Sequence, residues 1–199
     1  MSTIVVVRKD DLIAIAADTL TKAGHVKVYG RNRRDHDKIF RFRDTYIGTV
    51  GAIAHEDVLW DVLNRYSGEV SFANREAIFQ TYLKLHPILK QEYFINPVAE
   101  KDDDYESSQI EALVANPNGI FGMYTWRTII EYERFYAIGS GREYALGAMQ
   151  AVYDSLSADK IAQTGVVAAC EFDENSDLPF TLYSFPAAAD IASAASIGG

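Results

Sequence analysis

The clearest candidate for a reactive group in this sequence lies at its start, where Ser2 follows the initiator methionine. Methionine is normally removed ahead of a small residue, so we expect the mature chain to begin at Ser2. An α-amino group has an ordinary pKa of about 7.7–8.0, which suits a general base near neutral pH. A serine hydroxyl becomes a nucleophile when a base lies beside it, and an N-terminal amine can be that base. Ser2 is therefore either an ordinary exposed start or a residue that supplies both halves of a hydrolytic site.

Two glycine-containing junctions are further candidates. Gly48 and Gly51 fall within an apolar strand, where glycine marks either a bulge or the close approach of a ligand or another backbone. Farther on, an apolar strand runs into Gly139-Ser140-Gly141 and a helix follows at once. That junction presents amides and a hydroxyl at a helix N-terminus, which favours negative charge. The same tripeptide is as often only a flexible turn.

Composition excludes several classes of protein. The chain has 199 residues, of which 48% are hydrophobic and 24% charged, and this fits one domain with a sizeable core. A net charge of −9 argues against nucleic acid and anionic membranes as partners. The single cysteine, Cys170, fits a reducing compartment. With no apolar run of membrane-spanning length and no signal-peptide pattern, we expect a cytoplasmic protein, and we predict no cofactor and no metal site.

Hydrophobic periodicity predicts the elements that position these groups. The predicted strands are 3–7, 12–17, 26–29, 38–43, 46–51, 109–115, 120–125, 126–135, 136–138 and 178–185. The predicted helices are 53–66, 75–93 with a kink or break at Pro87, 142–149 and 158–170. A loop with a solvated acidic run is expected over 96–108, and a poorly ordered tail over 186–199. Alternating blocks of antiparallel strands and helices predict an α+β fold.

Taken together, several short motifs are similar in order and spacing to those of one family. They are Ser2-Thr3-Ile4-Val5, Ala17-Asp18, Lys38-Ile39, Gly48-x-x-Gly51, and Ala137-Ile138-Gly139-Ser140-Gly141 followed by Tyr144-Ala145. The chain resembles a proteasome β-type subunit, an N-terminal-nucleophile hydrolase, and is nearest to bacterial HslV-type peptidases and the proteobacterial proteasome homologues. The resemblance implies a peptidase domain over 2–185 that folds as a four-layer αββα sandwich of two antiparallel sheets. It also implies self-association into stacked rings that enclose the active sites.

The resemblance assigns roles to five residues. Ser2 would attack a peptide carbonyl and form an acyl-ester, with its own α-amine as the base. Lys38 would keep the pKa of that amine low, and Asp18 would orient Lys38. The amide of Gly48 would form the oxyanion hole, and Ser140 would hydrogen-bond near the amine. The positions that would line the specificity pocket carry mainly aromatic and apolar side chains and predict an apolar preference: His36, Phe40, Tyr46 and Val50.

One residue departs from the family pattern, because the family nucleophile is threonine and the aligned residue here is Ser2. Loss of the methyl group removes a restraint on χ1 of the nucleophile. Three functions therefore stay open: a ring-forming peptidase acting on peptides or unfolded proteins, a non-catalytic ring subunit, and a small-molecule amidohydrolase or acylase. The sequence carries no readable signature of a docking surface for an ATP-driven unfoldase.

Overall fold

The first two strands form the centre of the structure. In the computed structural model, which describes residues 2–98 and 105–188, β1 (Thr3–Lys9) and β2 (Leu12–Asp18) pair as an antiparallel hairpin. β10 (Phe135–Gly139) pairs with β1, and β11 (Phe180–Pro186) pairs with β2. The first sheet therefore has the order β10-β1-β2-β11.

The second sheet has five antiparallel strands in the order β5-β6-β7-β8-β9. Its strands are β5 (Ile39–Phe42), β6 (Thr45–Val50), β7 (Glu111–Asn116), β8 (Gly119–Met123) and β9 (Ile129–Tyr132). A small hairpin of β3 (Thr21–Ala23) and β4 (Val26–Val28) projects beside it, and a single 3-10 turn follows at Gly30–Asn32.

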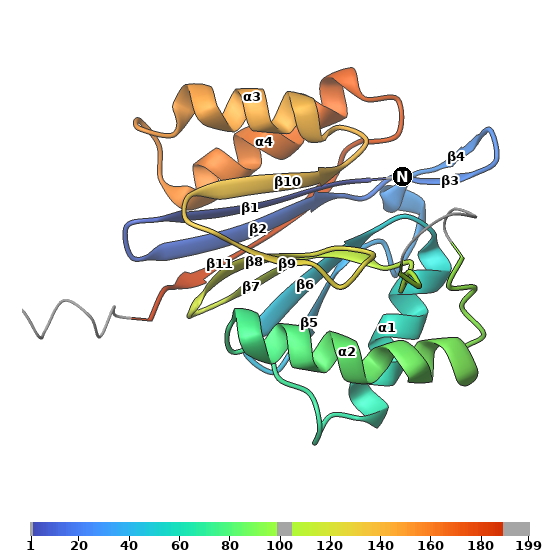
Figure 1. Cartoon of the computed structure of the whole chain (residues 1–199). Coiled ribbons are helices and arrows are strands. Elements are labelled where there is room, and N and C mark those ends of the chain that lie inside the picture. Colours follow the sequence, from blue (N-terminus) through green and yellow to red (C-terminus); the bar gives the residue numbers. More distant parts are fainter. Residues whose placement is uncertain (1, 99–104, 189–199) are drawn as a thin grey trace, which may run out of the picture.

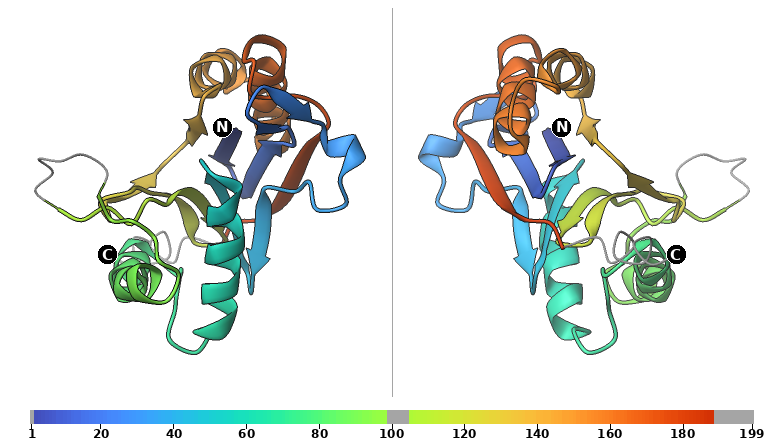
Figure 2. Two further views of the ribbon diagram at one scale, coloured as in Figure 1. Left: turned by 90° about the vertical axis from the view of Figure 1, so that its right-hand side faces the viewer. Right: turned by 90° about the vertical axis from the view of Figure 1, so that its left-hand side faces the viewer.

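Two pairs of helices cover the outer faces of the two sheets (Figure 1). α3 (Arg142–Val152) and α4 (Ala158–Phe172) lie on the first sheet, and α1 (Ile53–Arg65) and α2 (Arg75–Gln91) lie on the second (Figure 2). The predicted αββα sandwich is therefore confirmed. Within the described ranges, no helix is long and apolar enough to span a membrane.

The sandwich explains why β1 is apolar along its length rather than on alternate residues. Val5 and Val7 pack with α3 and α4, whereas Ile4 and Val6 pack into the core between the sheets. All four side chains are fully buried, as expected for a strand covered on both faces. On the helix-facing side of β2, Ala14 has no bulk beyond Cβ, which allows α4 to approach closely.

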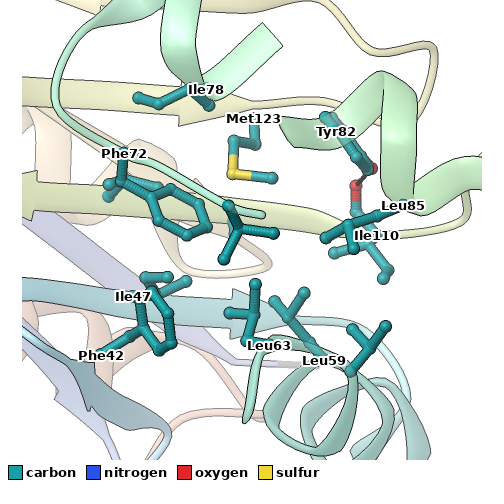
Figure 3. Packing of buried hydrophobic residues seen from close by; sticks show 14 of the residues in the cluster. Phe42, Ile47, Leu59, Leu63, Phe72, Ile78, Tyr82, Leu85, Ile110 and Met123 are labelled. Atoms are coloured by element: carbon teal, nitrogen blue, oxygen red, sulfur yellow. Dashed lines mark hydrogen bonds between the residues drawn. The ribbon is translucent and has the colours of Figure 1, made fainter. Parts of the chain in front are cut away.

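A separate core fills the space between the second sheet and α1 and α2 (Figure 3). The hydroxyl of Tyr82 on α2 is fully buried there and donates to the carbonyl of Ile110 at 2.5 Å. The hydrogen bond removes the cost of burying that hydroxyl and ties α2 to the residue that precedes β7. This core fixes the direction in which α1 leaves the sheet after β6.

The structure differs from the sequence prediction at α2 and over residues 126–135. α2 continues through Pro87 as one helix, because its buried face packs on the second sheet on both sides of the proline. The predicted strand over 126–135 is instead β9 and the first residue of β10, in different sheets and separated by a bend. Most of the predicted tail, 189–199, and most of the acidic run, 99–104, lie outside the described residues.

Gly48 marks the closest approach of the two sheets near the start of the chain. A Cβ on Gly48 would lie 2.9 Å from Cγ2 and 3.0 Å from Cδ1 of Ile4, which is closer than packed carbon atoms come. The absence of a side chain at Gly48 therefore makes room for the side chain of Ile4 on β1.

We predict that Gly48→Ala destabilises the protein by about 1–3 kcal/mol through overpacking, and that Ile4→Ala alone costs about 2–5 kcal/mol through a cavity. The double variant should cost less than the sum by at least about 0.5 kcal/mol, because each change relieves the other. Urea unfolding of all four proteins tests the coupling. Ile78→Ala, which opens a cavity in the other core, is the control that should add to Gly48→Ala without coupling. Simple additivity with Ile4→Ala would contradict the steric explanation.

Candidate active site

A fully buried ion pair lies at the end of the sandwich where β1 begins. Asp18 ends β2, and Lys38 directly precedes β5, so the pair joins the two sheets. The Nζ atom of Lys38 donates to both carboxylate oxygens of Asp18 at 2.9 Å and to the carbonyl of Leu20 at 2.6 Å. The side chains of Asp18 and Lys38 are 0% and 4% exposed, so solvent does not screen their attraction.

The hydrogen-bond partners of Asp18 favour its ionised form and oppose the effect of its burial. Burial raises the pKa of Asp18, whereas Lys38 and the amides of Thr3 and Leu20 act in the opposite direction. The amide of Thr3 donates to Oδ1 at 2.8 Å, and that of Leu20 donates to Oδ2 at 2.9 Å. All of these partners are donors, which is the pattern that stabilises a carboxylate over a carboxylic acid. Asp18 therefore orients Lys38 and also fixes the backbone next to Ser2.

The backbone of Ser2 is held from the other side by the junction between β10 and α3. The amide of Ser140 donates to the carbonyl oxygen of Ser2 at 3.0 Å. Gly139 has φ +94°, and a Cβ there would lie 1.8 Å from that same carbonyl oxygen. Only glycine is accommodated at position 139, because of both this positive φ and the close contact with the carbonyl of Ser2. Ser2 itself is buried, and its carbonyl therefore has one defined position.

A hydrogen-bonded network of hydroxyl and carboxylate groups supports this junction. Ser140 and Ser176 both donate from Oγ to Oδ2 of Asp173 at 2.7 Å. The hydroxyls of Thr3 and Ser176 are also 2.7 Å apart. A Cβ at Gly141 would lie 2.3 Å from Oγ1 of Thr3, so this glycine is also required by packing. Asp173 and Ser176, which follow α4, were not predicted from the sequence. Asp173 lies 33 residues from its partner Ser140, and Ser176 lies 173 residues from its partner Thr3.

Ser2 and Lys38 line one wall of a pocket of about 260 Å³ that opens to solvent. Gly51 lies on its rim, one residue past the last paired residue of β6 and two residues before α1. Its φ of +110° turns the chain out of the sheet. The start of β1 and the start of α1 lie at the same end of the molecule (Figures 1 and 2). The other lining residues are Leu20, Thr21, Lys22, Ala52, Ile53 and Glu56.

A second pocket, of about 360 Å³, adjoins the first and shares Lys38, Ile53 and Glu56 with it. Burial raises the pKa of Glu56 to about 7, while Lys38 and Arg33 act in the opposite direction. The other lining residues are Asp35, Asp37, Phe40, Asp57 and Trp60, together with Arg33. A carboxyl group with a pKa near neutrality thus lies in the wall that the two pockets share.

The structure brings four of the predicted catalytic residues together, namely Ser2, Asp18, Lys38 and Ser140. It contradicts the predicted oxyanion role of Gly48. Gly48 lies in the middle of β6, with β5 on one side and β7 on the other, and does not line the pocket.

Of the four residues predicted to line the specificity pocket, only Phe40 does so. Tyr46 instead stacks on rings of β11, and Val50 belongs to the core between the sheets. Both point away from the pocket because they share with Gly48 the face of β6 that meets the first sheet. Nδ1 of His36 lies 3.1 Å from the carbonyl of Arg33, and the ring does not line either pocket.

A signal for Gly51 was present in the sequence. It is the second glycine of the strand and the one directly ahead of a predicted helix, where a chain must leave its sheet. Glu56 and Asp57 of the second pocket gave no such signal, because in the sequence they look like part of the polar face of any surface helix.

Within 2–98 and 105–188, no cluster of three or more His, Cys, Asp or Glu residues is arranged to hold a metal ion.

Comparison with known proteins agrees with this architecture. A sequence model of the proteasome subunit family matches residues 1–171. Comparison with curated proteins gave no significant match.

Among solved structures, BPH from Thiobacillus denitrificans is 40% identical, with a TM-score of 0.88, and the alignment covers 94% of this chain and 100% of that one. A second structure of the same protein, in complex with epoxomicin, is also 40% identical, with a TM-score of 0.87 and the same coverage. HslV from Trypanosoma brucei is 22% identical, with a TM-score of 0.68, and covers 92% of this chain and 98% of its own; it shares the fold. Because the family model matches most of the chain and BPH is 40% identical over 94% of it, the chain belongs to the proteasome subunit family.

Proposed function

We propose that this chain is an N-terminal-nucleophile peptidase subunit that cleaves peptide bonds with Ser2 after removal of Met1, and that it self-associates into stacked rings. The observation that carries the proposal is the buried pair of Asp18 and Lys38 beside Ser2, in a pocket open to solvent. Burying two charges costs several kcal/mol per ion before their attraction offsets it. A ring subunit without catalytic activity has no need for such a pair next to its first residue.

In the proposed reaction, Oγ of Ser2 bonds to the carbonyl carbon of the substrate while its proton moves to the α-amine of Ser2. The C–N bond then breaks as the amine passes that proton to the leaving nitrogen. Water hydrolyses the resulting ester and restores Ser2. The ammonium group of Lys38 lowers the pKa of the α-amine, which keeps it unprotonated near neutral pH, and stabilises the developing negative charge.

We assign the oxyanion hole to the amide of Gly51 in place of Gly48. Gly51 lines the same pocket as Ser2, and it lies beyond the ladder of β6 and ahead of α1. Its amide is therefore not required for either element. Ser140 and Asp173 act as positioning residues, because they hold the carbonyl of Ser2 and the junction around Gly139.

The first experiment is the intact mass of the purified protein before and after incubation with a peptide epoxyketone. We expect a chain without Met1 that gains the mass of one inhibitor, with the adduct mapped to Ser2, because the inhibitor requires both a hydroxyl and a free amine on one residue. A matched Ser2→Ala protein should remain unmodified. Loss of Met1 without an adduct, or an adduct elsewhere, would contradict the peptidase proposal and favour a non-catalytic subunit or an acylase.

Lys38→Ala should lower peptide hydrolysis by at least about 100-fold, the range seen when one group that stabilises the transition-state charge is removed. The variant leaves the carboxylate of Asp18 buried without its counter-charge, at a cost of about 3–5 kcal/mol. Lys38→Met combined with Asp18→Asn removes both charges and serves as the control for folding. Size-exclusion chromatography should report the same assembly for this double variant as for the unmodified protein. Normal turnover in an assembled variant without the ammonium group would exclude the mechanism.

A chain that retains an extension ahead of Ser2 should be inactive, because an amide nitrogen at Ser2 cannot act as a base. The control is the same extension followed by a cleavage site that releases Ser2 as the first residue. Hydrolysis of a fluorogenic peptide should appear only after cleavage. Equal activity before and after release would show that the amine of Ser2 takes no part in the reaction.

A further inference from the structure

The second pocket of the candidate active site has a charge pattern that the sequence did not predict. This inference rests on the proposed function, because it identifies the pocket with the side chain of the substrate residue whose carbonyl Ser2 attacks. The two pockets share Lys38, Ile53 and Glu56, so a peptide bound at Ser2 would extend a side chain past these residues into the second pocket.

Four carboxylates and two cations line that pocket, and both cations are already engaged. Lys38 pairs with Asp18, outside the pocket lining. The guanidinium of Arg33 pairs with Asp35 at 3.4 Å and donates to Oγ1 of Thr21 at 2.5 Å. Both cations are therefore paired with groups other than Glu56, and their attraction for Glu56 only partly offsets the effect of its burial.

The four carboxylates differ in how many hydrogen-bond and ion-pair partners they have. Asp37 accepts hydrogen bonds from the amide of Ile39 at 2.9 Å, from the hydroxyl of Thr181 at 2.8 Å and from the hydroxyl of Tyr183. Asp35 has the ion pair with Arg33. By contrast, among the described residues, Glu56 and Asp57 form no ion pair. These two neighbours on the first turns of α1 are the acidic groups left for a ligand.

The remaining lining suits the carbon part of a long basic side chain. Phe40 and Trp60 supply aromatic surface, and Ile53 supplies aliphatic surface at the border with the first pocket. Trp60 is 55% exposed, although it is a large apolar residue. An aromatic face next to carboxylates binds the methylene groups of arginine or lysine and also attracts their charge.

We propose that the substrates carry an arginine or lysine at the residue that supplies the attacked carbonyl, and that Glu56, supported by Asp57, recognises its charge. This replaces the apolar preference expected from the sequence, which relied on His36, Phe40, Tyr46 and Val50 as the lining; of these, only Phe40 lines the pocket. Glu56 lies in the wall that separates the two pockets and is partly buried, so its attraction for a cation is less screened than that of an exposed carboxylate.

The pH dependence of this preference follows from the charge of Glu56. Its pKa is raised to about 7, so the side chain is largely neutral at pH 6 and largely ionised at pH 8. Preference for a basic residue should therefore increase as the pH rises. The charged groups around Glu56 in the two pockets and behind them are Asp18, Lys22, Arg33, Asp35, Asp37, Lys38 and Asp57.

The test uses three fluorogenic peptides that differ only in arginine, leucine or glutamate at the residue that supplies the attacked carbonyl. For the unmodified protein at pH 8, we expect kcat/KM to be at least about tenfold higher for arginine than for leucine, as for one hydrogen bond between charged groups. That ratio should fall between pH 8 and pH 6. Any titration of the catalytic groups themselves affects all three peptides alike and cancels in the ratio.

Glu56→Gln should reduce the arginine-to-leucine ratio by about tenfold, mainly through KM, and should remove its pH dependence. Asp57→Asn should reduce the ratio less. Glu76→Gln, at an exposed site in the first turn of α2, is the matched control and should leave all values unchanged. Size-exclusion chromatography checks that each variant assembles like the unmodified protein.

Two results would overturn the inference, and the epoxyketone adduct distinguishes them. If the adduct forms on Ser2 but leucine is preferred at every pH, or if the ratio survives in both variants, the basic preference is wrong and the peptidase function stands. If no adduct forms and no peptide is cleaved, both the proposed function and the inference fall together.

Discussion

The structure around the candidate site depends on one buried ion pair, that of Asp18 with Lys38. It joins the end of a strand in the first sheet to the start of a strand in the second, and it excludes solvent from both side chains. Such a pair is tolerated only when additional donors satisfy the carboxylate. Here the amides of Thr3 and Leu20 supply them, so the same contacts that stabilise the charge also fix the first residues of β1.

The second constraint is steric and involves glycines from distant parts of the chain. Gly48 leaves room for Ile4, Gly139 for the carbonyl of Ser2, and Gly141 for the hydroxyl of Thr3. Each would bring a Cβ within 3 Å of the first strand. Residues 2–4 are therefore packed closely against backbone from β6 and from the junction between β10 and α3, and this is why an otherwise free terminus can hold a reactive group in one place.

These constraints place the proposed catalytic groups and the proposed recognition groups on different elements of the fold. The groups near Ser2 belong to strands and to the junction before α3, whose positions are set by the two sheets. Glu56 and Asp57, the carboxylates proposed to recognise the substrate, belong to the first turns of α1, which is held by packing against the core around Tyr82. Changes at these two positions can therefore alter the proposed recognition without disturbing the ion pair. This arrangement is consistent with one fold that accepts different substrates.

Local sequence patterns predicted most of the fold and four of the groups that meet at the candidate site. The hairpin that starts the chain and the helices over 53–66 and 158–170 follow from local periodicity, because burial on one face leaves a repeating pattern. Ser2, Asp18, Lys38 and Ser140 were identified from short motifs. Three features could be seen only in the folded protein: Gly48 leaves room for Ile4, Gly51 lines the pocket, and Asp173 supports Ser140. These depend on contacts between residues far apart in sequence and on which face of β6 meets the other sheet, and no local pattern encodes either.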